Sequence, residues 1–210
     1  MTSRQSRALA LHSDRFALPA DGAPLDLERE FGPGFPVVLE IGFGTGEATA
    51  AMAEADRGTG ILAVDVHTPG VGQLLALVAD RDLDNVRVIQ GDAVEVVRDM
   101  LVPESLAGVR MFFPDPWPKA RHHKRRLVQP AFVDLMVTRL ARGAFVHCST
   151  DWPAYGAQMR DVLEAEPELE NLFAGYADRP ADRPMTRYEK RGIDRGHPVV
   201  DLVFRRRLAP

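Results

Sequence analysis

The chain has 210 residues with 45% hydrophobic content, which is enough to bury a sizeable core and excludes a wholly disordered protein. Its single cysteine, Cys148, excludes an internal disulfide, and no apolar stretch approaches the ~18 residues that cross a bilayer. The net charge of −4 means that any basic surface must be local. We therefore expect a cytoplasmic protein that does not contact membranes.

Residues 1–35 mix charges with prolines and glycines and lack a long apolar period. They are predicted to form a mobile extension, followed by one domain at 36–210. In that domain, apolar runs alternate with helix-like stretches. The first three strands are predicted at 37–41, 61–66 and 86–89, and the helices that follow them at 47–55, 71–79 and 93–101. Three successive strand-then-helix units predict a parallel sheet.

The second half of the domain continues the alternation and then departs from it. A fourth and a fifth strand are predicted at 109–113 and 144–148, with helices at 131–140 and 155–164. The sheet is expected to end in an antiparallel pair near 169–174 and 199–204. The fold class is therefore α/β, with a mostly parallel, seven-stranded sheet.

A glycine-rich turn follows the first strand, with Gly42, Gly44 and Gly46 at alternate positions. Glycines permit a tight bend there and let a ligand approach the backbone closely. The spacing is G-x-G-x-G and not the dinucleotide pattern G-x-G-x-x-G. Glycine turns also serve packing, so the turn alone is a weak indication of a nucleoside site.

Acidic residues lie at the ends of the first three strands. Glu40 is in an otherwise apolar strand, where a carboxylate is expected only if it is hydrogen-bonded or faces a ligand. Asp65 can accept both ribose hydroxyls of an adenosine ligand. Asp92 can reach an adenine amine or can cap the helix that begins at Ala93, and both alternatives stay open.

The acids also indicate which ligand the pocket would hold. The glycine turn contains no Lys or Arg. An acidic pocket disfavours a pyrophosphate but suits S-adenosylmethionine, whose ammonium and sulfonium groups are positive.

A proline-rich loop follows the fourth strand. Pro114, Pro116 and Pro118 exclude a helix or a central strand, and they enclose Asp115 and Trp117. Residues 119–126 hold five Lys or Arg and two His with no acid. A solvated charged loop has this composition too, but the combination of a rigid acid with a basic run favours a site that faces nucleic acid. His122 and His123 lack metal-ligand spacing, so no metal is expected.

The chain resembles the bacterial tRNA (guanine-N7-)-methyltransferases. Five blocks carry the resemblance: 39–46, 64–72, 113–119, 149–152 and 183–192, the last continuing to Gly196 and His197. The first block is common to many methyltransferases. The Pro-Asp-Pro-Trp-Pro-Lys and Thr-Arg-Tyr-Glu blocks are far more specific. The chain departs from the family at Asp65, where Glu is usual.

The resemblance implies a class I methyltransferase Rossmann-like fold and methyl transfer from S-adenosylmethionine to N7 of a guanine in tRNA, at position 46 of the variable loop. It implies cofactor contacts at Glu40, Asp65, Asp92 and Asp115. It also implies tRNA contacts at Lys119, Asp151, Thr186, Arg187, Tyr188 and Glu189. The oligomeric state, monomer or homodimer, stays open.

Guanine N7 carries a lone pair and no proton, so we expect positioning to dominate the reaction. Asp115 is predicted to be the catalytic residue, because a fixed carboxylate stabilises the cationic purine that forms. One alternative is a related methyltransferase that acts on another atom of an RNA base. Two others are an NAD-dependent oxidoreductase, for which the catalytic pair is absent, and a noncatalytic RNA-binding module, which would not need Glu40, Asp65 and Asp92.

Overall fold

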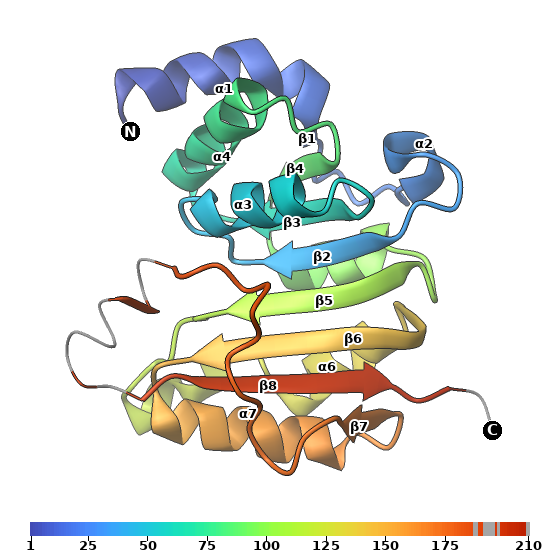
Figure 1. The fold of residues 1–210 in the computed structure, drawn as a ribbon, viewed down its shortest axis with the longest axis vertical. Coiled ribbons are helices and arrows are strands. Elements are labelled where there is room, and N and C mark those ends of the chain that lie inside the picture. Colours follow the sequence, from blue (N-terminus) through green and yellow to red (C-terminus); the bar gives the residue numbers. More distant parts are fainter. Residues whose placement is uncertain (187–188, 191–195, 197, 209–210) are drawn as a thin grey trace.

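The computed structural model describes residues 1–186, 189–190, 196 and 198–208. Its centre is one sheet with the strand order β1-β4-β3-β2-β5-β6-β8-β7 (Figure 1). The strands are β1 (Ala17–Leu18), β2 (Val37–Ile41), β3 (Gly60–Asp65), β4 (Val86–Gln90), β5 (Leu106–Phe112), β6 (Leu140–Thr150), β7 (Leu169–Asn171) and β8 (Val200–Arg206). The strands from β1 to β6 are parallel, and β8 is antiparallel to both β6 and β7. This confirms the predicted fold class.

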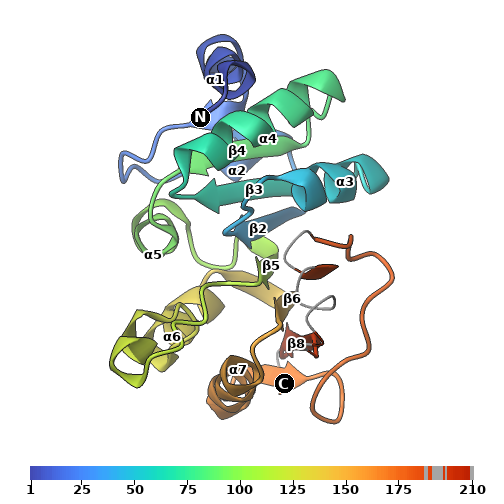
Figure 2. The ribbon, with the colours of Figure 1, turned by 90° about the vertical axis from the view of Figure 1, so that its left-hand side faces the viewer.

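Helices cover both faces of the sheet. They are α1 (Ser3–Phe16), α2 (Leu27–Phe31), α3 (Glu47–Ala55), α4 (Thr68–Asp80), α5 (Ala93–Glu95), α6 (Pro130–Val137) and α7 (Pro153–Ala165). A π-helical turn, η1 (Val96–Met100), continues α5, and a 3₁₀ helix, η2 (Ala120–Arg125), follows the proline-rich loop. Figures 1 and 2 show α1, α3 and α4 on one side of the sheet and α5, α6 and α7 on the other.

The core is divided by the sheet into two apolar clusters. Along β3, Leu62 and Val64 belong to one cluster, and Ile61 and Ala63 belong to the other. Successive residues of a strand point to opposite faces, so a strand that is buried on both faces is apolar throughout. This explains the uninterrupted apolar runs in the sequence.

Residues 1–35 are where the structure differs most from the prediction. They form α1, β1 and α2, and β1 pairs with β4, so the sheet has eight strands in the described residues and not seven. Thr2 and Gln5 form a capping box that starts α1. A Cβ on Gly72 of α4 would lie 2.7 Å from the carbonyl oxygen of Gln5, so glycine permits a close contact between the two helices. The mobility of this segment stays a prediction.

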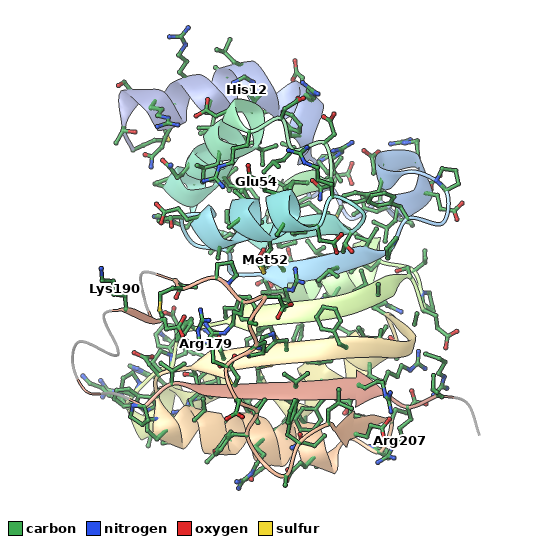
Figure 3. All side chains as sticks on the ribbon, in the orientation of Figure 1. His12, Met52, Glu54, Arg179, Lys190 and Arg207 are labelled. Atoms are coloured by element: carbon green, nitrogen blue, oxygen red, sulfur yellow. The ribbon has the colours of Figure 1, made fainter. Side chains whose placement is uncertain are left out.

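Residues 172–186, which follow β7, cross the sheet face that α3 and α4 leave uncovered (Figure 1). Ala177 donates a backbone hydrogen bond of 2.8 Å to Asp201 O on β8. Figure 3 shows Arg179 among the side chains between this segment and the sheet. The segment then reaches the carboxyl ends of the central strands, where Thr186 lies beside the glycine turn.

Candidate active site

The glycine turn joins β2 to α3 and depends on left-handed backbone. Gly42, Gly44 and Gly46 have φ values of 75°, 61° and 72°, which side chains disfavour. A Cβ on Gly46 would lie 2.7 Å from Cβ of Leu74, and a Cβ on Gly70 would lie 2.1 Å from the Gly44 carbonyl oxygen. The turn is therefore held tightly against α4.

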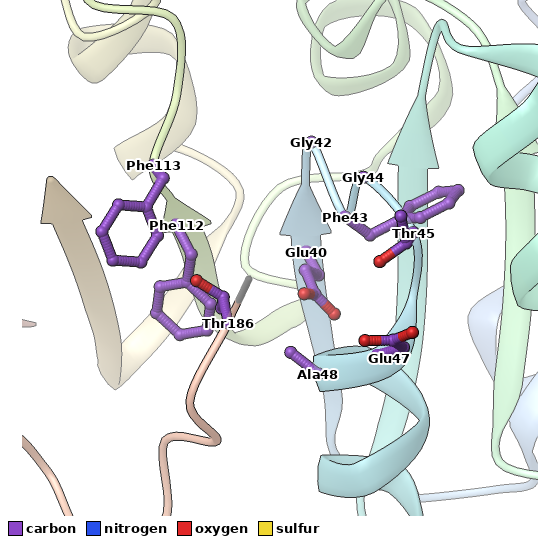
Figure 4. Close-up of a pocket in the computed structure, with 10 residues that line it drawn as sticks. All are labelled: Glu40, Gly42, Phe43, Gly44, Thr45, Glu47, Ala48, Phe112, Phe113 and Thr186. Carbon is purple, nitrogen blue, oxygen red and sulfur yellow. The ribbon is translucent and has the colours of Figure 1, made fainter. Parts of the chain in front are cut away.

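Glu40 lies in a pocket at the carboxyl edge of the sheet (Figure 4). The pocket is lined by Glu40, Gly42, Phe43, Gly44, Thr45, Glu47, Ala48, Phe112, Phe113 and Thr186. Glu40 is 3% exposed, and its Oε2 has no hydrogen-bond partner among the described residues. Burial raises the pKa of Glu40 from 4.5 to about 7, although Thr49 and Arg110 act in the opposite direction. Thr49 Oγ1 also has no hydrogen-bond partner among the described residues.

The second and third acids form local hydrogen bonds. Asp65 Oδ2 accepts from Gly44 N at 2.9 Å, and Oδ1 accepts from His67 N at 2.9 Å. Asp65 therefore connects the glycine turn to the end of β3. Asp92 is the N-cap of α5 and accepts from Val94 N at 2.7 Å, which confirms the capping alternative. Both carboxylates keep lone pairs that can accept further hydrogen bonds.

The proline-rich loop begins where β5 ends. Phe113 and Trp117 have φ values of 51° and 43°, an unusual conformation for bulky residues that indicates a constrained loop. Asp115 is exposed, with no hydrogen bond or ion pair among the described residues. The ring of Trp117 packs edge-on against His122, at 5.9 Å between centroids, and the Arg125 guanidinium lies 5.0 Å from its centroid.

Arg126 differs from the rest of the basic run because it is 4% exposed. Its Nε donates to Pro116 O at 2.8 Å, and its Nη1 donates to Gln158 of α7. The guanidinium also lies 4.8 Å from the centroid of the Tyr155 ring. Arg126 therefore fixes the proline-rich loop to α7, and the interpretation of the whole run as a phosphate-facing patch was wrong for this residue.

The other basic residues of the run are available to solvent. The exposed side chains are Lys119, Arg121, Lys124 and Arg125. Asp151 follows β6 and is half-buried beside Trp152, Pro153 and Pro198. Because β5 and β6 are parallel neighbours, with Phe112 paired to Ser149, the loops that carry Asp115 and Asp151 leave the same edge of the sheet.

The Thr-Arg-Tyr-Glu block has a structural role that the sequence reasoning missed. Glu189 N donates to Thr186 Oγ1 at 3.0 Å, and Thr186 N donates to Glu189 Oε2 at 3.4 Å, the reciprocal pattern of a capping box. The S/T-x-x-E spacing was the available signal. Arg187 and Tyr188 lie outside the described residues.

Glu189 is buried and holds two arginines. Burial acts to raise its pKa, but hydrogen bonds from Arg183 and Arg179 outweigh this effect and hold the pKa of Glu189 below its ordinary value. Its carboxylate is thus engaged within the protein. Within the described ranges, no cluster of His, Cys, Asp and Glu could hold a metal ion, and no helix is long and apolar enough to span a bilayer.

Comparison with known proteins identifies the family. A family described as putative methyltransferase matches residues 35–202. The chain is 57% identical over 208 residues to the tRNA (guanine-N(7)-)-methyltransferase of Streptomyces avermitilis, which covers 98% of this chain and 72% of the relative. The chain belongs to the tRNA (guanine-N(7)-)-methyltransferase family. The enzyme of the same name from Aromatoleum aromaticum is 54% identical over 207 residues, covering 99% of this chain and 80% of the relative.

Solved structures share the fold at low sequence identity. The 16S rRNA methyltransferase KamB aligns with a TM-score of 0.63 at 15% identity, covering 86% of this chain and 92% of that one. An rRNA methylase from Streptococcus thermophilus aligns with a TM-score of 0.54 at 14% identity, covering 83% and 87%. These likenesses confirm the predicted methyltransferase fold. The family membership confirms the resemblance carried by the five sequence blocks.

Proposed function

We propose that this protein transfers the methyl group of S-adenosylmethionine to N7 of a guanine in tRNA, at position 46 of the variable loop. The observation that carries the proposal is the buried carboxylate of Glu40, which faces a pocket beside three left-handed glycines and has an unpartnered oxygen. Among the described residues that line this pocket there is no Lys or Arg, so their chemistry suits a cationic ligand and not a pyrophosphate.

The described residues fit this cofactor. When bound, S-adenosylmethionine supplies a methyl group activated by a positive sulfur. Glu40 would stabilise the cationic end of the cofactor, and Gly42, Gly44 and Gly46 would admit it close to the backbone. Asp65 would accept hydrogen bonds from the ribose hydroxyls through the lone pairs that are not used by Gly44 N and His67 N. Asp92 would accept from the adenine amine at the neighbouring strand end.

Asp115 would face the guanine. A carboxylate there accepts hydrogen bonds from guanine N1–H and N2–H₂ and stabilises the positive charge that develops on the purine. Its exposure, its freedom from partners among the described residues and the rigid loop that carries it support this role. Asp151 would contact the base from the adjoining loop.

The tRNA backbone would lie along the exposed basic residues of η2 and Lys119. Thr186, Arg187 and Tyr188 would contact the substrate from the segment that precedes β8. The packing of Trp117 against His122 and Arg125 means that stacking on an extruded base would require this ring to leave its present contacts. We further propose that the protein acts in the cytoplasm, as a monomer or homodimer.

The test is incubation of the protein with an unmodified tRNA transcript and methyl-labelled cofactor, followed by nucleoside analysis. The expected product is 7-methylguanosine, and a transcript with adenosine at position 46 should accept no label. Another methylated nucleoside would refute the N7 assignment. Label in the adenosine-46 transcript would refute the position only.

A further inference from the structure

A buried cluster of charges lies under the segment that joins β7 to β8. Arg183, Glu189 and Asp201 are 2%, 1% and 1% exposed. Arg183 Nη1 and Nη2 donate to the two oxygens of Glu189 at 2.7 and 2.8 Å. On its other side, Nη2 donates to Asp201 Oδ2 at 3.0 Å, and Nε lies 2.9 Å from Asp201 Oδ1. One guanidinium thus connects the segment to β8.

The cluster extends to the end of β5, where the proline-rich loop begins. The Arg183 guanidinium lies 5.9 Å from the ring centroid of Phe112 and 5.7 Å from that of Phe113. His147 of β6 contacts Asp201 Oδ1 through Nε2 at 2.7 Å and packs edge-on against Phe112. Arg183 is therefore held between the carboxylates of Glu189 and Asp201. It also lies against Phe112 and Phe113, which line the cofactor pocket.

The position of Thr186 depends on this cluster. Glu189 Oε2 accepts from both Arg183 Nη1 and Thr186 N, and Glu189 N donates to the Thr186 hydroxyl. That hydroxyl accepts through a lone pair, so it can still donate its own proton to a second partner. Thr186 lines the pocket opposite Glu40 and Glu47 (Figure 4).

We propose that Arg183 is a positioning residue for methyl transfer: through Glu189 and Asp201 it holds Thr186 at the wall of the cofactor pocket. This inference rests on the proposed function. Arg183 and Asp201 are buried, so neither acts by touching tRNA. The role of Glu189 follows from the same contacts, since both of its oxygens bind arginines within the protein.

The chain offers a matched control at the opposite end of β8. Arg206 is 5% exposed and bridges Glu104 and Glu168, at 3.0 and 2.8 Å, while it also donates to Leu140 O. It resembles Arg183 in its own burial and in having two carboxylate partners, although the side chains of Glu104 and Glu168 are 54% and 39% exposed, and it lies away from the pocket. A purely structural role for Arg183 predicts that cofactor binding is unchanged in a folded lysine variant of either arginine.

The experiment measures binding of S-adenosylhomocysteine by calorimetry for the full chain and for Arg183→Lys, Asp201→Asn and Arg206→Lys. Lysine cannot reproduce the two-sided contacts of a planar guanidinium. We expect the dissociation constant to rise about fivefold or more for Arg183→Lys and Asp201→Asn, and to stay within about twofold of wild type for Arg206→Lys. Circular dichroism establishes that each variant is folded, and Asp201→Asn carries the test if Arg183→Lys does not fold.

A double-variant cycle with Thr186→Val tests whether Arg183 acts through Thr186. If it does, the loss in Arg183→Lys/Thr186→Val should match the larger single loss, because residues that act as one unit are not additive. Unchanged cofactor binding in folded Arg183→Lys or Asp201→Asn would overturn the proposal. It would also be overturned if the affinity losses of Arg183→Lys and Thr186→Val multiplied in the double variant. If wild type neither binds the probe nor methylates tRNA, the proposed function itself fails, which is a different result.

Discussion

Removal of the buried charge at Glu40 should stabilise the fold and weaken the binding of the cofactor. The pKa of this carboxyl is raised from 4.5 to about 7 by burial. A carboxyl whose pKa is raised in the folded state lowers the free energy of unfolding as pH rises from 4.5 to 7. Above pH 7 the full destabilisation persists. The shift corresponds to about 3 kcal/mol at pH 8, of which about 1 kcal/mol is present at pH 5.5.

Glu40→Gln removes this titration while preserving the shape of the side chain. Urea unfolding of the cofactor-free protein, followed by circular dichroism, should therefore show that the variant gains on wild type by about 2 kcal/mol between pH 5.5 and pH 8. Loss of the charge should also raise the dissociation constant of S-adenosylmethionine by about 10- to 100-fold, as measured by calorimetry at pH 8. For wild type, affinity should rise with pH up to about pH 7, because the cationic ligand binds the ionised carboxylate.

The control is Glu47→Gln, which removes a carboxylate from a position on the same pocket that is not fully buried. Because this variant retains Glu40, it should keep the loss of stability between pH 5.5 and pH 8 that Glu40 causes. An equal pH dependence of stability in wild type and Glu40→Gln would refute the raised pKa of the buried Glu40 carboxyl. Unchanged cofactor affinity in Glu40→Gln would refute its role in binding.

Three further results are expected. Asp115→Ala should lower methyl transfer to tRNA by about 100-fold or more and leave the melting temperature unchanged, since the side chain is exposed; substantial turnover would contradict its role. Arg121→Ala/Lys124→Ala should reduce the slope of log K against log salt concentration for tRNA binding by about 0.7–0.9 per lost phosphate contact. Arg207→Ala should leave this slope unchanged, and equal slopes in the two variants would exclude η2 from the interface. Gly46→Ala should cost about 2–4 kcal/mol in urea unfolding because of its positive φ and its contact with Leu74; a loss no greater than that of Gly22→Ala, where the space is open, would contradict this packing argument.

The sequence predicts the parallel half of the fold closely. The predicted bounds of β2 and α3 agree with the structure, because a fully apolar strand, a glycine turn and a helix-forming run are all local signals. The helix predicted to reach Leu140 instead ends at Val137, and β6 begins at Leu140. Apolar residues suit either element, so periodicity alone could not separate them there.

The burial of Arg126 and Arg183 depends on long-range contacts, whereas the capping box of Thr186 and Glu189 had a local signal that was missed. Arg126 was grouped with its basic neighbours because nothing local distinguishes it from them, and its burial follows from the approach of Tyr155 and Gln158. Arg183 lies in one of the five sequence blocks, but its contact with Asp201, 18 residues away on β8, has no local signal in the sequence. Charge runs in a sequence therefore overstate the surface that is available to a polyanion.

Helix α4 separates the cofactor turn from the amino-terminal helix by a fixed thickness. Gly70 meets the carbonyl of Gly44, and Gly72 meets the carbonyl of Gln5. Residues two apart on a helix point to nearly opposite sides, so α4 has no room for a side chain at Gly70 on one side or at Gly72 on the other. A larger residue at Gly70 would push directly on the cofactor turn, whereas one at Gly72 would displace only α1. Extensions added before α1 should accordingly leave the dimensions of the pocket unchanged.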